Sequence, residues 1–417
     1  MDASGKLSYL NNGEPIISAE ELPNPSYLCI LERVDGGDDS RSSNRPPVLR
    51  DGGLCIVSEL PGGKFHSFSV KVEPTLSGEM KIHAKAAGEA LDTGGSWPCH
   101  IMSTNVGHEM ECIVICNYGE DEGVLSVFGF HRGSPTDVYS KQASISFGTG
   151  SKADHNRQEA SHAHSASVFP SFYNSSTLDI CCADLGSDAI VQFALTTDAS
   201  TTPVNGQVVS LQCIENERLS APSGSGPRSL MFNPIYTNVA IVSLEMSAQV
   251  WLIQRRVDDG KFAALGEPVS VLPESWPTES ESEYQFNNGR WASDAVWSPC
   301  GKFVYAAARL HNSISVFEVI LSTTLAEKSF TAASEEITGL TLVQRIPTNG
   351  ITPRCLCMSE CGQLLLVAHQ HSHDVASFQR NRTNGKITFV DRIEVPNAAC
   401  VKLIRPDQII GSGYGRR

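Results

Sequence analysis

The feature that most constrains the fold of this chain is an internal repeat of about 64 residues. Five segments align when Cys99, His164, Arg228, Ser293 and Arg354 share one position, with successive separations of 65, 64, 65 and 61 residues. Short apolar stretches follow these positions, as in the run Arg-Ser-Leu-Met-Phe that starts at Arg228. A spacing this regular is typical of one supersecondary unit packed against copies of itself.

Each repeat has the pattern of antiparallel strands joined by short turns. A turn such as residues 299–302 precedes a continuous apolar run such as 303–308, and an alternating run such as 313–317 follows. The continuous runs predict strands buried on both faces, and the alternating runs predict half-buried strands. About six such units can be recognised, the earliest over residues 53–70. Turn-linked strands with this period predict the blades of a β-propeller.

We therefore expect an all-β chain in which residues 1–417 form one domain, a seven-bladed β-propeller with four-stranded antiparallel blades. The two ends of the chain are expected to form the closing blade. Its inner strands are predicted within 399–404 and 408–410, and its outer strands within 6–10 and 15–18. The polar stretches 131–160, 194–222 and 254–289 are predicted to be outer strands and surface loops.

Charge and cysteine usage exclude several classes of protein. A net charge of −14 argues against non-specific binding to nucleic acid or to anionic membranes. Arginines that converge on one pocket can still reverse the potential locally. The 13 cysteines occur largely in apolar runs such as residues 112–116, which is typical of small buried side chains in a reducing compartment. No signal peptide pattern or membrane-length apolar run is seen. We expect a cytoplasmic protein that can exist as a monomer.

Seven short motifs occur in order between about residue 50 and residue 400, and together they resemble one known family. They are similar to motifs of the seven-bladed propeller lactonases of the bacterial 6-phosphogluconolactonase type, which include the fungal carboxy-cis,cis-muconate cyclases. The motifs are His162-Ala-His-Ser, Asp184-Leu-Gly-Ser-Asp, Gly226-Pro-Arg-Ser-Leu-Met-Phe-Asn-Pro, Leu244-Glu-Met-Ser-Ala-Gln-Val, Arg290-Trp-Ala-Ser-Asp, Ala308-Arg-Leu-His-Asn-Ser-Ile-Ser-Val-Phe and Thr352-Pro-Arg.

The repeat is expected to gather polar residues at one mouth of the propeller channel. In an antiparallel hairpin, the start of one strand and the end of the next lie at the same edge. First strands of blades line the channel, so residues at these two places should meet around its mouth. The polar residues there are His164, Arg228 and Arg354 at strand starts, and Asn117, Asp184, Glu245, Arg309 and His369 near strand ends.

Opening a lactone requires an activated water, stabilisation of the carbonyl oxygen and a proton for the leaving ring oxygen. A His or Glu can transfer the protons, and Arg can stabilise an oxyanion or bind an anionic substrate group. The resemblance implies that the catalytic residues are His164, Arg228, Glu245 and Arg309. Arg290, Arg354, Asn117 and Trp291 are the candidate substrate-binding residues, the first two for an anionic tail.

The resemblance implies hydrolysis of a small anionic sugar lactone, most closely 6-phosphogluconolactone, in the oxidative pentose phosphate route. A carboxymuconolactone-type cycloisomerase, another lactonase and a non-catalytic propeller scaffold are the alternatives. The base is expected to be His164, with Glu245 as the alternative. A purely structural Arg228–Glu245 salt bridge is the competing interpretation of that pair.

Three histidines at alternate positions, His369, His371 and His373, raise the question of a metal site. Alternate residues of a strand share a face, so three ligands are geometrically possible. The run crosses a turn into the next strand, however, and the alternation breaks there. We therefore predict no metal and no cofactor. Asp184 is similarly expected to stabilise the turn of its own blade rather than to contact substrate.

Overall fold

The computed structural model describes residues 7, 17, 22–31, 53–74, 80–106, 110–131, 140–170, 177–197, 211–256, 258–276, 291–324 and 334–403. These residues form six antiparallel sheets, each built from strands that are consecutive in the sequence. The described part of the chain contains no helix long and apolar enough to cross a membrane. The all-β propeller with four-stranded antiparallel blades is therefore confirmed.

The first three sheets follow one another along the N-terminal half. Their strands are β1 (Pro25–Leu31), β2 (Gly53–Ser58), β3 (Lys64–Pro74), β4 (Met80–Ala86) and the short β5 (Leu91–Asp92); β6 (Pro98–Val106), β7 (Met110–Asn117), β8 (Val124–His131) and β9 (Ser140–Ser146); and β10 (Ala163–Pro170), β11 (Thr177–Asp184), β12 (Ala189–Thr197) and β13 (Leu211–Ser220).

The other three sheets repeat this order in the C-terminal half. Their strands are β14 (Pro227–Phe232), β15 (Val239–Leu244), β16 (Gln249–Arg255), β17 (Phe262–Ala264) and the short β18 (Val269–Ser270); β19 (Ala292–Trp297), β20 (Phe303–Ala308), β21 (Ser313–Thr324) and β22 (Ser334–Pro347); and β23 (Pro353–Met358), β24 (Leu364–His369), β25 (Asp374–Arg380) and β26 (Ile387–Glu394).

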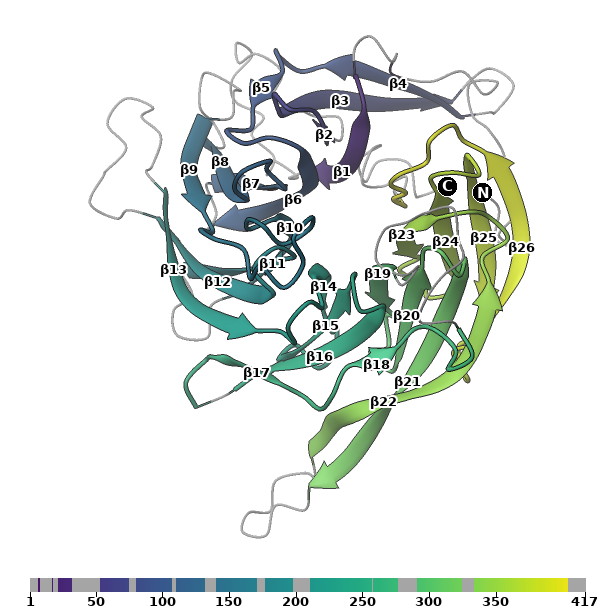
Figure 1. Ribbon diagram of the computed structural model, residues 1–417. Coiled ribbons are helices and arrows are strands. Elements are labelled where there is room, and N and C mark those ends of the chain that lie inside the picture. The colour runs from purple at the N-terminus through teal and green to yellow at the C-terminus, as the bar shows by residue number, and fades with distance from the viewer. Residues whose placement is uncertain are drawn as a thin grey trace.

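The six sheets are arranged as blades of a ring, with the first strand of each blade nearest its centre (Figure 1). Every residue of β15, β20 and β24 is buried, as the continuous apolar runs predicted. Apolar side chains of neighbouring blades pack together, for example Val316 and Phe378 in the core shared by the fifth and sixth blades. Burial of these faces between blades is the main force that holds the ring together.

A β-bulge near the start of the first strand recurs in all six described blades. Pairing with the second strand skips Ser26, Cys99, His164, Arg228 and Arg354, and in the fifth blade it skips Ser293 and Asp294. The aligned positions of the sequence repeat are therefore the bulged residues. A bulge leaves its extra residue out of the ladder and redirects the side chain, and bulges are frequent beside active sites.

The predicted closing blade lies largely outside the described residues, which include only Leu7, Ile17, 22–31 and 399–403 near the chain ends. The inner strand expected from residue 399 is absent over 399–403, which join no β-ladder. A strand at 399–403 would need a neighbouring strand of the closing blade to pair with. Residues 399–403 nevertheless pack between β23 and β1, because the Cys355 thiol donates to the Val401 carbonyl and Lys402 contacts Tyr27.

Candidate active site

A cavity of about 460 Å³ lies at the centre of the ring and is lined by the first strands of all six described blades. This volume is in the range usual for small-molecule sites. The polar side chains on its wall include those of His100, His164, Arg228, Asp294, Arg354 and Lys402. His164, Arg228 and Arg354 were the first-strand residues expected at the channel, and all three reach it.

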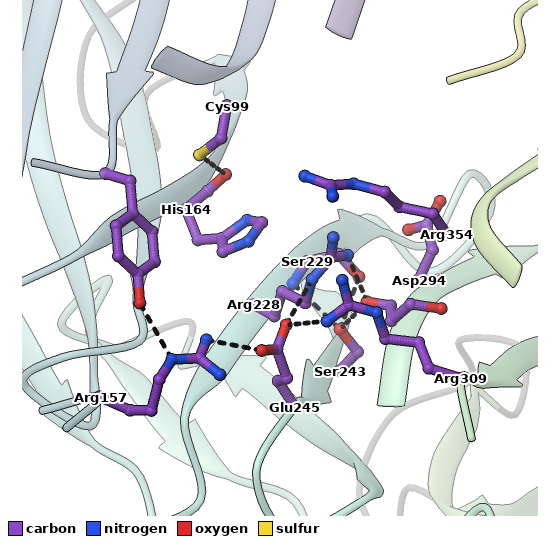
Figure 2. Close-up of polar contacts among 12 residues, drawn as sticks. Cys99, Arg157, His164, Arg228, Ser229, Ser243, Glu245, Asp294, Arg309 and Arg354 are labelled. Carbon is purple, nitrogen blue, oxygen red and sulfur yellow. Dashed lines mark hydrogen bonds and ion pairs between the residues drawn. The ribbon is translucent and has the colours of Figure 1, made fainter. Parts of the chain in front are cut away.

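The carboxylate of Glu245 is the centre of the polar group beside this cavity (Figure 2). Its Oε1 lies 2.7 Å from Nη2 of Arg157, and its Oε2 lies 2.7 Å from Nε of Arg228 and 3.2 Å from Nη1 of Arg309. Glu245 is 1% exposed, so water contributes almost nothing to its solvation. Three guanidinium groups thus replace water around one carboxylate.

The protonation state of this group follows from two opposing effects. Burial raises the pKa of Glu245, but the charges of Arg309, Arg157 and Arg228 outweigh it and hold that pKa well below its usual range. Burial lowers the pKa of Arg309 to about 9, although Glu245 opposes the shift, so the guanidinium stays charged at neutral pH. Glu245 and Arg309 are therefore both charged at pH 7.

The hairpin of the fourth blade brings Arg228 and Glu245 together. Arg228 is the bulged residue of β14, and Glu245 directly follows β15, the strand paired with it. Nη1 of Arg228 also donates to the carbonyl of Ser293 at 2.7 Å, and the Ser243 hydroxyl donates to that same oxygen at 2.9 Å. These contacts fix the guanidinium against the next blade.

His164 lies on the cavity wall and points into the space above Glu245 (Figure 2). Burial and the charge of Arg228 lower its pKa well below the ordinary histidine value, and Glu245 opposes the shift. Its imidazole is therefore neutral at pH 7. The ring of Tyr118 lies edge-on to it, with centroids 6.0 Å apart, and limits its orientation.

Arg157 is a residue of this group that the sequence reasoning missed. It follows no strand and lies in the segment before His162, in a stretch predicted only as outer strand or loop. Its Nε donates to the Tyr118 hydroxyl at 3.3 Å, and its amide donates to Asp154 Oδ1 at 3.0 Å. The only sequence feature that could have indicated a role for Arg157 is its position five residues before His162. The other repeats have no arginine at the corresponding position.

Trp291, one of the predicted substrate-binding residues, contacts two of the arginines. The guanidinium carbon of Arg157 is 5.5 Å from the centroid of its ring, and that of Arg309 is 5.3 Å away. Cation–π attraction of this kind stabilises both guanidinium orientations. The tryptophan thus contacts the charged group itself, whereas Arg290 falls outside the described residues.

The remaining predicted residues differ in where their side chains lie. Arg354 lines the cavity and donates to Gln370 Oε1 at 3.0 Å and to Glu59 Oε2 at 3.2 Å. Asn117 does not reach the cavity wall. It is fully buried, and its Nδ2 donates to the Val124 carbonyl and to Ser126, so its amide joins strands of its own blade.

Asp184 and the histidine run have structural contacts of their own. Asp184 Oδ1 accepts hydrogen bonds from the amides of His162 and Gly186, which stabilises the turn as expected. His369 pairs with Asp374 at 2.7 Å, His371 with the Thr352 hydroxyl at 2.8 Å, and His373 Nδ1 accepts from the Asn397 amide at 3.0 Å. The described residues contain no group of three metal-type ligands.

Comparison with known proteins agrees with this architecture. The 6-phosphogluconolactonase of Bacillus subtilis (strain 168) is 26% identical over 313 residues, which is 74% of each chain. A protein of Formosa agariphila that bears the same name is 26% identical over 346 residues, 81% of this chain and 84% of its own.

Solved structures show the same fold. The periplasmic gluconolactonase of Pseudomonas aeruginosa superimposes with a TM-score of 0.63 at 21% identity, covering 92% of this chain and 89% of its own. A protein from Lactobacillus plantarum gives 0.63 at 20% identity, covering 91% and 88%. The profile of the family described as "Lactonase, 7-bladed beta-propeller" matches residues 75–403. The chain belongs to this seven-bladed β-propeller lactonase family.

Proposed function

We propose that this protein hydrolyses a phosphorylated sugar lactone, 6-phosphoglucono-1,5-lactone, to the open acid. The observation that carries the proposal is the Arg157–Glu245–Arg228–Arg309 group beside His164, at the wall of a cavity of sugar size. The names of the Bacillus and Formosa relatives support the choice of substrate. Buried charges that shift one another's pKa values beside a cavity are more typical of a functional site than of a scaffold.

In the proposed reaction, His164 removes a proton from a water molecule whose oxygen attacks the lactone carbonyl carbon. The neutral imidazole can accept that proton, and it returns it to the ring oxygen as the carbon–oxygen bond breaks. Arg228 lines the cavity and would stabilise the oxyanion of the tetrahedral intermediate. Arg309, which contacts the same Glu245 oxygen as Arg228, would add to the positive charge near this oxyanion. The products are the hydroxy acid and the unchanged enzyme.

Glu245 has a different role in this scheme. A carboxylate whose pKa is far below neutrality, and whose two oxygens are both occupied by guanidinium groups, is a poor base. Its charge instead orients Arg228 and Arg309 toward the substrate carbonyl before the reaction starts. Preorganised charge of this kind is a large part of enzymatic rate enhancement.

The experiment that tests the proposal compares three substrates with one enzyme preparation. Hydrolysis of 6-phosphoglucono-1,5-lactone, unphosphorylated glucono-1,5-lactone and a carboxymuconolactone is followed by proton release. We expect the highest kcat/KM on the phosphorylated lactone, and Arg228→Ala and Arg309→Ala should each lower it about a hundredfold. A preference for the carboxymuconolactone would instead assign the alternative function, and no activity on any of the three would favour a scaffold.

We also propose that a seventh blade closes the ring, with contributions from both ends of the chain. Residues 399–403 lie between the inner strands β23 and β1. The amide of Leu7 donates to Asp391 on the outer strand β26 at 2.9 Å, and Leu7 packs in the same apolar cluster as Val401 and Leu403. Deleting residues 1–10 is expected to lower the melting temperature substantially, and an unchanged temperature would argue against such closure.

Finally, we propose a reducing compartment, the cytoplasm, as the place of action. The structure describes the side chains of twelve cysteines, and all twelve thiols are free. The sulfurs of Cys116 and Cys182 lie 3.7 Å apart and share a hydrogen bond rather than a disulfide bond. Thiol labelling of the protein in intact cells, before any lysis, should modify reduced cysteines and detect no disulfide.

A further inference from the structure

The central cavity contains a second cationic site that the proposed reaction does not use. Lys402 lies on the cavity wall, between the first and the last of the described blades. Its Nζ donates to the Tyr27 hydroxyl at 2.9 Å and lies 4.6 Å from the centroid of the same ring. The lysine is thus held in place by one phenol from β1.

This ammonium group has no acidic partner among the residues that the structure describes. Its hydrogen-bond partner, Tyr27, is a neutral phenol whose pKa burial raises. Asp294 lines the same cavity, but its two oxygens accept hydrogen bonds from the amides of Ala295 and Leu356. A charged group held inside a protein without a counter-charge is costly, unless a ligand supplies the missing charge.

Arg354, on the same wall, differs from Lys402 because Glu59 already pairs with it at 3.2 Å. Arg228 is likewise paired with Glu245. When the ion-pair partners are counted, the described charges at and beside the wall are three negative ones, on Glu59, Glu245 and Asp294, and five positive ones, on Arg157, Arg228, Arg309, Arg354 and Lys402. The cavity wall is therefore cationic although the chain as a whole carries −14. An anion of charge about −2 would balance the wall, and a phosphate monoester at pH 7 has about this charge.

His100 links the Lys402 site to the catalytic arginines. Burial, followed by the charges of Lys402 and Arg228, lowers the pKa of His100 to about 3, so both cations lie near one imidazole. Its ring lies 4.6 Å from that of Tyr27, and its Nδ1 accepts the Ala166 amide at 3.4 Å. The ring is neutral, and its Nε2–H remains a hydrogen-bond donor.

We propose that Lys402 binds the phosphate group of the substrate and thereby determines the preference for phosphorylated over unphosphorylated lactones. The proposal rests on the function proposed above and adds the residue that recognises the phosphate. The lactone carbonyl would lie near Arg228 and His164, and the phosphate would lie past His100, beside Lys402 and Tyr27. His100 donates a second hydrogen bond to the phosphate oxygens from Nε2.

The test compares Lys402→Met with Lys402→Arg. Methionine keeps much of the length that packs on Tyr27 but lacks the charge, whereas arginine keeps the charge. We expect Lys402→Met to lower the ratio of kcat/KM for 6-phosphogluconolactone over gluconolactone about 30-fold, and Lys402→Arg to restore most of it. Lys64→Met, which removes an exposed lysine paired with Asp92 on the first blade, is the matched control and should leave the ratio unchanged.

Calorimetry with the reaction products separates this proposal from the proposed function. Wild-type protein should bind 6-phosphogluconate at least tenfold more tightly than gluconate, and Lys402→Met should lose that difference. This binding preference would support the Lys402 site even if the enzyme hydrolysed none of the lactones. Absence of hydrolysis would contradict only the proposed function. If Lys402→Met does not fold, Lys402→Gln replaces it. Equal loss on both ligands, or an unchanged preference for the phosphorylated one, would overturn the assignment.

Discussion

Nε of Arg228 and Oε2 of Glu245 lie 2.7 Å apart across the hairpin formed by β14 and β15. Both side chains are almost completely buried, and their ion pair is shared with Arg157 and Arg309. Because burial of the carboxyl is outweighed by these cations, the folded-state pKa of Glu245 lies below its unfolded value. The ion pair therefore stabilises the protein above about pH 4.5, and this stability is lost as pH falls toward the folded-state pKa.

Replacement of Glu245 by Gln should destabilise the fold as well as abolish activity. Three guanidinium groups would remain buried without a counter-charge, which costs about 3 kcal/mol or more in the free energy of unfolding. Chemical denaturation at pH 7 measures this change. Glu215→Gln removes the carboxylate of the exposed pair with Arg218 and should cost less than about 1 kcal/mol. Equal effects of the two substitutions would contradict the central role of Glu245.

Replacement of His164 by Asn should lower kcat about a hundredfold or more, with KM changed only slightly, because the imidazole acts in the proton transfers. In the wild-type enzyme, burial and Arg228 lower the pKa of His164, so kcat/KM should stay high well below pH 6.5 before its acid limb appears. Steady-state rates from pH 4 to 9 measure both effects. Near-normal turnover with an unchanged pH profile in His164→Asn would identify Glu245 as the base.

Arg157 is expected to act on the reaction through Glu245. Arg157→Met removes the partner of Glu245 Oε1 and should lower kcat/KM about tenfold to thirtyfold, with the loss mainly in kcat. Arg157→Lys should recover part of this activity. Arg218→Met removes an arginine of similar size from an exposed pair and is the control. If both methionine variants keep full activity, Arg157 has only a structural role.

The chain is expected to unfold as one unit. Neighbouring blades share apolar cores, such as the one that joins Cys116 to Cys182 in the second and third blades, so half of the ring would expose a large apolar face. Limited proteolysis should cut within 35–50 or 131–160 without releasing a folded half. Recovery of two fragments that each unfold cooperatively would show two domains.

Catalysis is expected to need no metal ion. His164 supplies the proton transfers and the arginines supply the positive charge that a Lewis acid would otherwise provide. Prolonged dialysis against a chelator should therefore leave kcat on the lactone unchanged. Loss of activity that one divalent cation restores would contradict this prediction and return attention to the histidines at 369, 371 and 373.

The sequence by itself determined the elements that depend on periodicity. The 64-residue spacing predicted the blades, the apolar runs predicted the buried second strands, and the hairpin rule placed Arg228 beside Glu245. These predictions succeeded because strand pairing is local and side chains alternate with a fixed period. The same rule placed Asn117 correctly at the edge of its blade that faces the channel mouth. It could not predict that the Asn117 side chain points into its own blade and not into the cavity.

Only the tertiary structure decided which residues complete the site. Arg157 reaches Glu245 from 88 positions away, and Lys402 reaches Tyr27 from 375 positions away, and neither lies in a repeated strand. The bulges that direct His164 and Arg354 into the cavity also have no separate signal in the sequence pattern. Such placements depend on contacts between distant segments, which form only when the blades pack into a ring and bury their charges together.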